Sequence, residues 1–219
     1  MTGDLFAALR APSVERIDDG ATWLRAFADE QAAALVQAIE QVAAQAPFRQ
    51  MQTPGGYTMS VAMSNCGEFG WVTDRRGYRY QRDDPLSQRP WPAMPGVFAA
   101  LAAKAAFVAG FDKFMPDACL INRYVPGARM SLHQDKNEGD MAQPIVSVSL
   151  GLPATFLFGG GERADRPVRM RLESGDVVVW GGPARLRFHG VDTLAEGVHE
   201  LTGKCRYNLT FRKAGQGMS

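Results

Sequence analysis

The chain has 219 residues, of which 46% are hydrophobic and 21% are charged. This length and composition predict one large globular domain with an ample core. The net charge is +1, from 24 basic and 23 acidic residues, which argues against a uniformly basic nucleic-acid-binding surface but leaves room for local patches. No apolar run approaches the ~20 residues of a membrane span, and the N-terminus lacks a basic segment followed by an apolar one.

Cysteine usage points to a reducing environment. Cys66, Cys119 and Cys205 are scattered along the chain and odd in number. They form no Cys-x-x-Cys pair, so neither a zinc site nor a disulfide framework is indicated. We therefore expect a cytoplasmic protein without a membrane partner.

Two helices are expected. Residues 29–46 place Leu35, Ile39 and Val42 at helical spacing, and residues 95–107 form a second alanine-rich segment between a proline and a glycine. Their many alanines suggest close packing against a sheet.

Most of the remaining chain has the pattern of short strands. The segment 57–63 alternates, with Tyr57, Met59, Val61 and Met63 on one face. Turn signals such as Gly159-Gly160-Gly161 separate the other segments. Many short strands with regular turns predict a mainly β protein with flanking helices, either a sandwich or a jelly roll. The other expected strands are 119–124, 130–133, 145–150, 154–158, 168–172, 176–180, 186–189 and 205–212.

A candidate metal site lies at His133-Gln134-Asp135, with His189 as a distant partner. In an extended segment, residues i and i+2 point the same way, so His133 and Asp135 could bind one metal. Two histidines and one carboxylate that leave other positions open are typical of non-haem Fe(II) oxygenases. The alternative is that His133 and Asp135 are ordinary polar residues at a strand end and that His189 is unrelated to them. The third histidine, His199, is expected to be an exposed loop residue.

The closing strand predicts an anion site. Within 205–212, Arg206, Asn208, Thr210 and Arg212 share one face, and the apolar residues share the other. Two guanidiniums at most about 20 Å apart could hold the ends of a short dicarboxylate, because the guanidinium fork pairs with carboxylates bidentately. A solvated edge strand would show the same alternation and stays open as an alternative.

The segment 71–82 interleaves arginines with Trp71, Tyr78 and Tyr80. Arginines suit phosphates, and flat aromatic rings suit the stacking of bases. This segment is therefore a candidate nucleic-acid groove. A solvated hairpin with aromatic cross-strand pairs explains it equally well.

Several motifs together resemble the AlkB family of bacterial dioxygenases. The resemblance covers residues 45–213 strongly and the first 45 residues weakly. The motifs are Pro54–Met63, Asp117–Tyr124, Ser131–Lys136, Pro144–Pro153, Gly175–Gly182 and Arg206–Arg212.

The resemblance implies a double-stranded β-helix that carries Fe(II) and uses 2-oxoglutarate and O2. It implies oxidative demethylation of N-alkylated bases such as 1-methyladenine and 3-methylcytosine, with release of formaldehyde, succinate and CO2. The partner would be single-stranded DNA, with double-stranded DNA and RNA as further candidates, and the enzyme would be a monomer. Residues 1–90 would form an N-terminal extension and nucleotide-recognition lid, 91–213 the dioxygenase core and 214–219 a tail, all within one compact unit.

The resemblance also assigns residues to three roles. The metal ligands would be His133, Asp135 and His189. The 2-oxoglutarate contacts would be Asn122, Arg123, Tyr124, Arg206, Tyr207, Asn208, Leu209, Thr210, Phe211 and Arg212. The substrate contacts would be Thr53, Met59, Met63, Trp71, Tyr78, Arg79, Tyr80, Ser131, Lys136, Asn137, Glu138 and Arg163, with Trp71 and His133 enclosing the base.

One residue departs from the family pattern. Asn137 stands where the family has an acidic residue that contacts the exocyclic amine of the base. An asparagine can accept a hydrogen bond there but carries no charge. The preference between methylated adenine and methylated cytosine is therefore open.

Two other functions remain open at this stage. A hydroxylase of proteins or small molecules would keep the same fold and cofactors, and the aromatic-basic segment argues against it. A non-enzymatic binder of damaged DNA would need neither the metal ligands nor both arginines.

Overall fold

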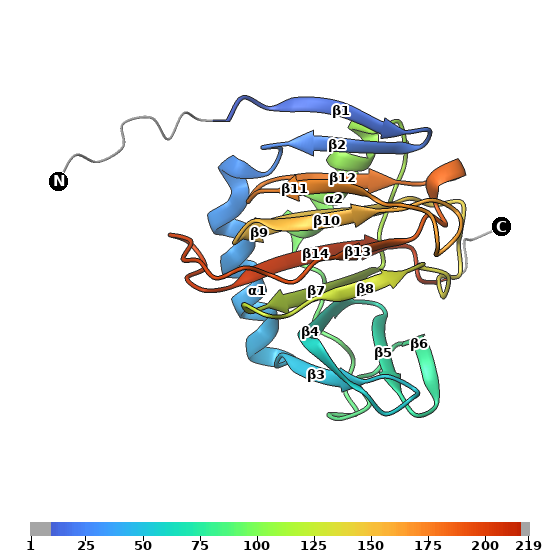
Figure 1. The fold of residues 1–219 in the computed structure, drawn as a ribbon. Coiled ribbons are helices and arrows are strands. Elements are labelled where there is room, and N and C mark those ends of the chain that lie inside the picture. Colours follow the sequence, from blue (N-terminus) through green and yellow to red (C-terminus); the bar gives the residue numbers. More distant parts are fainter. Residues whose placement is uncertain (1–9, 216–219) are drawn as a thin grey trace.

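The computed structural model describes residues 10–215 and contains fourteen strands and two long helices within them (Figure 1). The helices are α1 (Ala32–Gln45) and α2 (Gly96–Val108), with short 3-10 turns at Asp29–Gln31 and Gly182–Ala184. The strands are β1 (Ser13–Asp18), β2 (Ala21–Arg25), β3 (Arg49–Gln52), β4 (Thr58–Gly67), β5 (Gly70–Asp74), β6 (Gly77–Gln81), β7 (Ala118–Tyr124), β8 (Met130–His133), β9 (Ile145–Gly151), β10 (Ala154–Phe158), β11 (Val168–Leu172), β12 (Val177–Trp180), β13 (His189–Val191) and β14 (Arg206–Arg212).

Two antiparallel sheets and a separate hairpin make up the β structure. The large sheet has the order β1-β2-β12-β9-β14-β7-β4-β3, and the small sheet has the order β11-β10-β13-β8. Among the strands of residues 10–215, β5 and β6 pair with each other and with no other strand. Strands that follow one another in sequence repeatedly lie in different sheets, which is the jelly-roll arrangement that the strand pattern predicts.

Strand β14 shows how alternation builds the two layers. Leu209 and Phe211 face the helices and join the core cluster that contains Ile39 of α1 and Phe98 of α2. The intervening residues Arg206, Asn208, Thr210 and Arg212 point to the other side of the sheet and line a cavity that residues of β8 and β13 also line. β14 lies between β9 and β7, and all of its residues except the half-buried Tyr207 are buried, so the solvated-edge alternative is excluded.

Most predicted elements agree with the structure. Both helices are confirmed, with ends shifted by up to three residues, and strands 130–133, 154–158 and 168–172 have the predicted bounds. The predicted strand 186–189 is wrong: β13 begins at His189, because Ala184 and Arg187 are tied into successive turns after Gly181. Strands β1, β2 and β3 were not expected.

The first 90 residues contribute strands to the same sheet as the rest of the chain. Strand β2 pairs with β12, and β4 pairs with β7. Within the predicted tail of residues 214–219, the backbone N–H groups of Ala214 and Gly215 donate to the carboxylate of Asp117. Residues 216–219 lie outside the described range. Neither helix in the described range is long and apolar enough to span a membrane.

The helix layer should contribute strongly to stability. Ile39 is 1% exposed, whereas the next residue, Glu40, is exposed. We expect Ile39→Ala to lower the free energy of unfolding by about 2–5 kcal/mol, measured by urea denaturation. Glu40→Ala should stay within about 0.5 kcal/mol of the parent protein, and equal effects of the two substitutions would contradict this packing.

Candidate metal and co-substrate site

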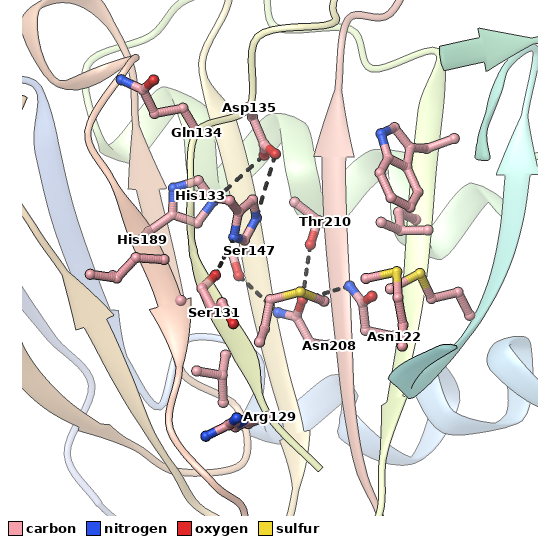
Figure 2. A pocket seen from close by; sticks show the side chains of 18 of the residues that line it. Asn122, Arg129, Ser131, His133, Gln134, Asp135, Ser147, His189, Asn208 and Thr210 are labelled. Atoms are coloured by element: carbon pink, nitrogen blue, oxygen red, sulfur yellow. Dashed lines mark hydrogen bonds and ion pairs between the residues drawn. The ribbon is translucent and has the colours of Figure 1, made fainter. Parts of the chain in front are cut away.

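A cavity of about 930 Å³ lies between the two sheets and opens beside the β5–β6 hairpin. The strands of both sheets contribute polar side chains to it, as Figure 2 shows. The cavity brings together all three predicted metal ligands, both arginines of the predicted anion site and most of the predicted substrate contacts. Those lining it are His133, Asp135, His189, Asn122, Tyr124, Arg206, Asn208, Thr210, Arg212, Thr53, Met59, Met63, Trp71, Tyr78, Ser131, Lys136, Asn137 and Arg163.

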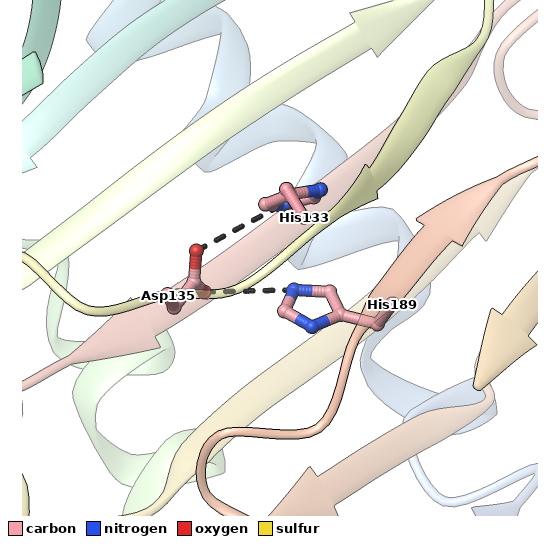
Figure 3. A group of neighbouring side chains, drawn as sticks. All are labelled: His133, Asp135 and His189. Atoms are coloured by element: carbon pink, nitrogen blue, oxygen red, sulfur yellow. Dashed lines mark ion pairs between the residues drawn. The ribbon is translucent and has the colours of Figure 1, made fainter. Parts of the chain in front are cut away.

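Strand pairing places the two histidines side by side. His133 ends β8 and is directly opposite His189, which begins β13. Asp135 follows β8 outside the strand and turns back toward both rings (Figure 3). Its carboxylate oxygens lie 3.7 Å from Nε2 of His133 and 3.7 Å from Nε2 of His189. The candidate ligand atoms of the three residues all lie within 4.8 Å of one another.

The backbone orients both imidazole rings. Nδ1 of His133 lies 2.9 Å from the carbonyl oxygen of Ser131, and Nδ1 of His189 lies 3.0 Å from that of Arg187. Carbonyl oxygens can only accept, so Nδ1 is assigned as the protonated nitrogen in each ring. The Nε2 lone pairs then point at the space beside Asp135. Two imidazoles and one carboxylate on one side of a cavity fit Fe(II), with room for further ligands.

Electrostatics keep these groups in the protonation states that a metal requires. Burial raises the pKa of Asp135, but the adjacent Arg212 and the two histidines outweigh this effect and hold the pKa below its usual range. Burial, reinforced by the His133 ring, lowers the pKa of His189 to about 3. The carboxylate is therefore ionised and the His189 ring is neutral near pH 7, as metal coordination needs.

Arg206 lies at the deep end of the cavity with unused donors. It is 1% exposed, and one of its NH2 groups donates to the Ser149 hydroxyl at 2.9 Å. Its Nε and its other terminal nitrogen have no hydrogen-bond partner within the described residues. A buried guanidinium with free donors is costly unless an anion completes it. The geometry therefore fits one carboxylate of a dicarboxylate co-substrate.

A rigid amide network forms the floor between Arg206 and the metal site. The side-chain amide of Asn208 donates to the Ser147 hydroxyl at 2.8 Å, and its oxygen accepts from Asn122 at 3.2 Å and from Thr210 at 2.9 Å (Figure 2). The Asn122 oxygen itself has no partner in the described part of the chain. These bonds fix the amides in position before any ligand arrives.

Four residues predicted to contact the co-substrate do not line the cavity. Arg123 lies over the Phe48 ring, and Tyr207 packs against the same ring. Leu209 and Phe211 belong to the helix-side core. The physical reason is the two-residue period of a strand, which turns every second side chain of β7 and β14 away from the cavity.

Aromatic rings stand at the mouth of the cavity. Trp71 and Tyr78 stack with their ring centroids 5.6 Å apart and an interplanar angle of 19°. The side chain of Asn65 holds the backbone of Trp71 by bonding both its N–H and its carbonyl at 3.0 Å. The segment is thus a hairpin with stacked aromatics, and its inner face borders the cavity.

Three predicted substrate contacts are occupied elsewhere. Arg79 forms a bidentate pair with Asp74 at 2.9 and 3.0 Å within the hairpin. Tyr80 and Glu138 bond to each other and do not border the cavity. His199, expected to be an exposed loop residue, is half-buried and lies outside the metal cluster. Its Nδ1 accepts from the backbone N–H of Leu201.

Several residues of the site are not indicated by the predicted motifs. Ser147 and Ser149 had a readable signal, because they are polar positions at two-residue spacing in an otherwise apolar strand. Arg129 lies shortly before the predicted metal motif and Gln134 lies within it, and both line the cavity. Arg185 carries no local signal, since only the fold brings it beside Asp135.

Removal of one imidazole should abolish metal binding while the fold survives. We expect His189→Ala to weaken Fe(II) binding by more than about 100-fold, because even loss of a group that merely supports a ligand costs about 10–100-fold. Anaerobic titration calorimetry measures this affinity. The matched variant His199→Ala should bind Fe(II) like the parent protein, and equal affinities of the two variants would contradict the assignment.

Comparisons with known proteins agree with this geometry. The family model of the 2OG-Fe(II) oxygenase superfamily matches residues 20–212. The chain is 59% identical to the alpha-ketoglutarate-dependent dioxygenase AlkB of Escherichia coli and 58% identical to that of Salmonella typhimurium, in each case over 97% of this chain and 98% of the relative. This similarity extends well into the first 45 residues.

A solved structure and a more distant relative extend the comparison. The structure of OsALKBH1 superposes with a TM-score of 0.81 and 26% identity, over 92% of this chain and all of that one. The tRNA demethylase abh1 of Schizosaccharomyces pombe is 32% identical over 67% of this chain and 47% of its own length. The chain therefore belongs to the 2OG-Fe(II) oxygenase superfamily and, within it, to the AlkB family of alpha-ketoglutarate-dependent dioxygenases.

Proposed function

We propose that this Fe(II)- and 2-oxoglutarate-dependent dioxygenase removes methyl groups from N-alkylated nucleic-acid bases such as 1-methyladenine and 3-methylcytosine. One observation carries the proposal: a single cavity joins the two-histidine, one-carboxylate cluster, the partly unpaired Arg206 and an aromatic mouth. AlkB dioxygenases of about 58% identity support it. The products would be the repaired base, formaldehyde, succinate and CO2.

The metal and co-substrate would be held by separate sets of residues. His133, Asp135 and His189 would bind Fe(II), and Arg206 would bind the distal carboxylate of 2-oxoglutarate. Asn122, Tyr124, Asn208 and Arg212 line the space between and would complete the co-substrate contacts. When bound, iron, 2-oxoglutarate and O2 supply the oxidising power that hydroxylates the methyl group. The protein contributes binding, orientation and exclusion of water.

The aromatic mouth would select the base. Trp71 and His133 both line the cavity, where they could enclose a flipped base, and Tyr78 is 46% exposed beside them. A cationic methylated base pairs poorly and so costs less to flip than a normal base. Stacking of the cationic ring on Trp71 would add a cation–π attraction of about 1–2 kcal/mol.

Positions around the mouth suit the sugar-phosphate backbone. Lys136 and Arg129 are exposed and line the cavity, and Arg163 lies over the Phe188 ring at 5.3 Å. Asn137 is exposed at the same rim. Its uncharged amide would contact the base and affect the preference between methylated adenine and methylated cytosine. Single-stranded DNA is the proposed partner. The tRNA demethylase among the relatives favours RNA as a further partner.

The β5–β6 hairpin would act as the nucleotide-recognition lid of residues 1–90, since it borders the cavity without joining either sheet. The protein would act as a monomer in the cytoplasm, where its free cysteines stay reduced.

The direct test is demethylation of a single-stranded oligonucleotide that carries 1-methyladenine or 3-methylcytosine. Anaerobically reconstituted enzyme is exposed to air, and mass spectrometry follows the loss of one methyl group. We expect loss that requires both Fe(II) and 2-oxoglutarate, and the two rates report the base preference that Asn137 sets. Turnover of 2-oxoglutarate without any loss of methyl groups would refute nucleic-acid repair and favour a hydroxylase of other substrates.

Arg206 should determine co-substrate affinity. Arg206→Met keeps the apolar stem but removes the charged donors, so we expect 2-oxoglutarate to bind at least about 30-fold more weakly, which corresponds to about 2 kcal/mol or more. Titration of the Fe(II) enzyme under nitrogen measures the affinity. Arg123→Met, on the opposite face of the sheet, is the matched control and should bind normally. Equal weakening by both substitutions would argue against the assigned carboxylate position.

A further inference from the structure

A buried cluster of charged and polar groups lies beside the metal site, where the β5–β6 hairpin meets the loop that follows Asp135. It contains two arginines, Arg185 and Arg212, and two carboxylates, Asp135 and Glu138, with the Tyr80 hydroxyl at one end. The four charged side chains are between 2% and 11% exposed. The two arginines balance the two carboxylates, so the cluster carries no net charge.

Glu138 is the centre of this cluster. One of its oxygens accepts from the Tyr80 hydroxyl at 2.9 Å and lies 3.4 Å from Nε of Arg212. The other oxygen accepts from Arg185 at 3.0 Å. A carboxylate that is buried and shared in this way is engaged by the protein itself, which leaves it little capacity to contact a base.

Both arginines contact Glu138 and also donate hydrogen bonds to the metal ligand Asp135. Arg212 donates to one carboxylate oxygen of Asp135 through Nε at 2.8 Å and through a terminal nitrogen at 2.6 Å. Arg185 donates to the backbone carbonyl of Asp135 at 2.7 Å. The side chain and the main chain of Asp135 are therefore both held by groups that Glu138 holds.

Tyr80 connects Glu138 with the aromatic hairpin at the mouth of the cavity. It stands on β6 directly opposite Trp71 on β5 and two residues after Tyr78. Burial raises the pKa of Tyr80 well above its usual range, so the hydroxyl keeps its proton and donates it. The hairpin pairs with neither sheet, and the Tyr80–Glu138 bond ties its side chains to the metal site.

We propose that Glu138 is a positioning residue that couples the aromatic hairpin to Asp135 and Arg212, so that seating a base at Trp71 and binding 2-oxoglutarate strengthen each other. The inference rests on the proposed function, since it takes the base and the co-substrate as the two ligands. A base that orders the hairpin fixes Tyr80 and hence Glu138 and Arg212. The co-substrate then binds to side chains that are already ordered, so its binding costs less conformational entropy. Thermodynamic linkage makes the effect reciprocal.

The test compares two losses of a hydroxyl from the same hairpin. Tyr80→Phe removes only the group that bonds to Glu138. Thr73→Val is the matched control, because the Thr73 hydroxyl is also buried but has no hydrogen-bond partner within the described residues. Anaerobic calorimetry of the Fe(II) enzyme gives the 2-oxoglutarate affinity with and without a single-stranded oligonucleotide that contains 3-methylcytosine.

The readout is the affinity for 2-oxoglutarate with the oligonucleotide divided by the affinity without it. For the parent protein and Thr73→Val we expect the oligonucleotide to tighten 2-oxoglutarate binding about fivefold or more. For Tyr80→Phe the ratio should fall close to one, while the affinity without oligonucleotide stays within about twofold of the parent value. A general loss of structure would lower both affinities and leave the ratio unchanged.

Glu138→Gln provides an independent check. The amide oxygen can still accept from Tyr80, but the amide nitrogen then faces the donor of Arg185 and cannot accept from it, so Arg185 loses its anchor beside Asp135. We expect weaker 2-oxoglutarate binding both with and without the oligonucleotide, in contrast to Tyr80→Phe.

The outcomes separate the two proposals. A Tyr80→Phe ratio equal to that of Thr73→Val, or a parent ratio of one, would overturn the coupling while repair activity stands. Parent enzyme that binds 2-oxoglutarate normally but neither binds nor demethylates the oligonucleotide would overturn the proposed function, and the coupling with it.

Discussion

Strand β14 is buried on both faces, and its two faces carry opposite chemistry. One face packs Leu209 and Phe211 against the helices, as any sheet core does. The other face places Arg206, Asn208, Thr210 and Arg212 in the space between the sheets. Polar groups at that depth are tolerated only when they are hydrogen-bonded. Most of these side chains have hydrogen-bond partners in the protein, and the unpaired donors of Arg206 are left for a ligand.

The partners of the polar face come from neighbouring strands. Ser147 on β9 and Asn122 on β7 bond to the Asn208 amide, and Ser149 on β9 accepts from one nitrogen of Arg206. Arg212 donates to Asp135. The donors of Arg206 that remain mark the place of a carboxylate. Charge balance points the same way. One carboxylate of the 2-oxoglutarate dianion would compensate the buried charge of Arg206, which forms no ion pair with a carboxylate within the described residues.

The parts of the site that sequence could predict are those with local regularity. The His-x-Asp spacing and the alternation in 205–212 each place functional side chains on one face, and the structure shows those side chains lining one cavity. The same period separates Leu209 and Phe211 from the co-substrate contacts, although all had been grouped together. Strand β1 escaped prediction because most of its residues are exposed and show no apolar alternation.

Long-range pairing limits the rest. No spacing rule connects Glu138 with Tyr80, 58 positions away, or with Arg185, 47 positions away. Glu138 follows the metal motif closely in sequence and so had the pattern of a substrate contact. Only the fold shows that its carboxylate is enclosed by two arginines and a tyrosine.

A crystal structure of the anaerobic Fe(II)–2-oxoglutarate complex, with iron located by anomalous scattering, would test both halves of the site at once. We expect iron bound by Nε2 of His133, Nε2 of His189 and the carboxylate of Asp135, with a 2-oxoglutarate carboxylate on the free donors of Arg206. Iron bound elsewhere, or 2-oxoglutarate bound while those donors remain unpaired, would contradict this assignment.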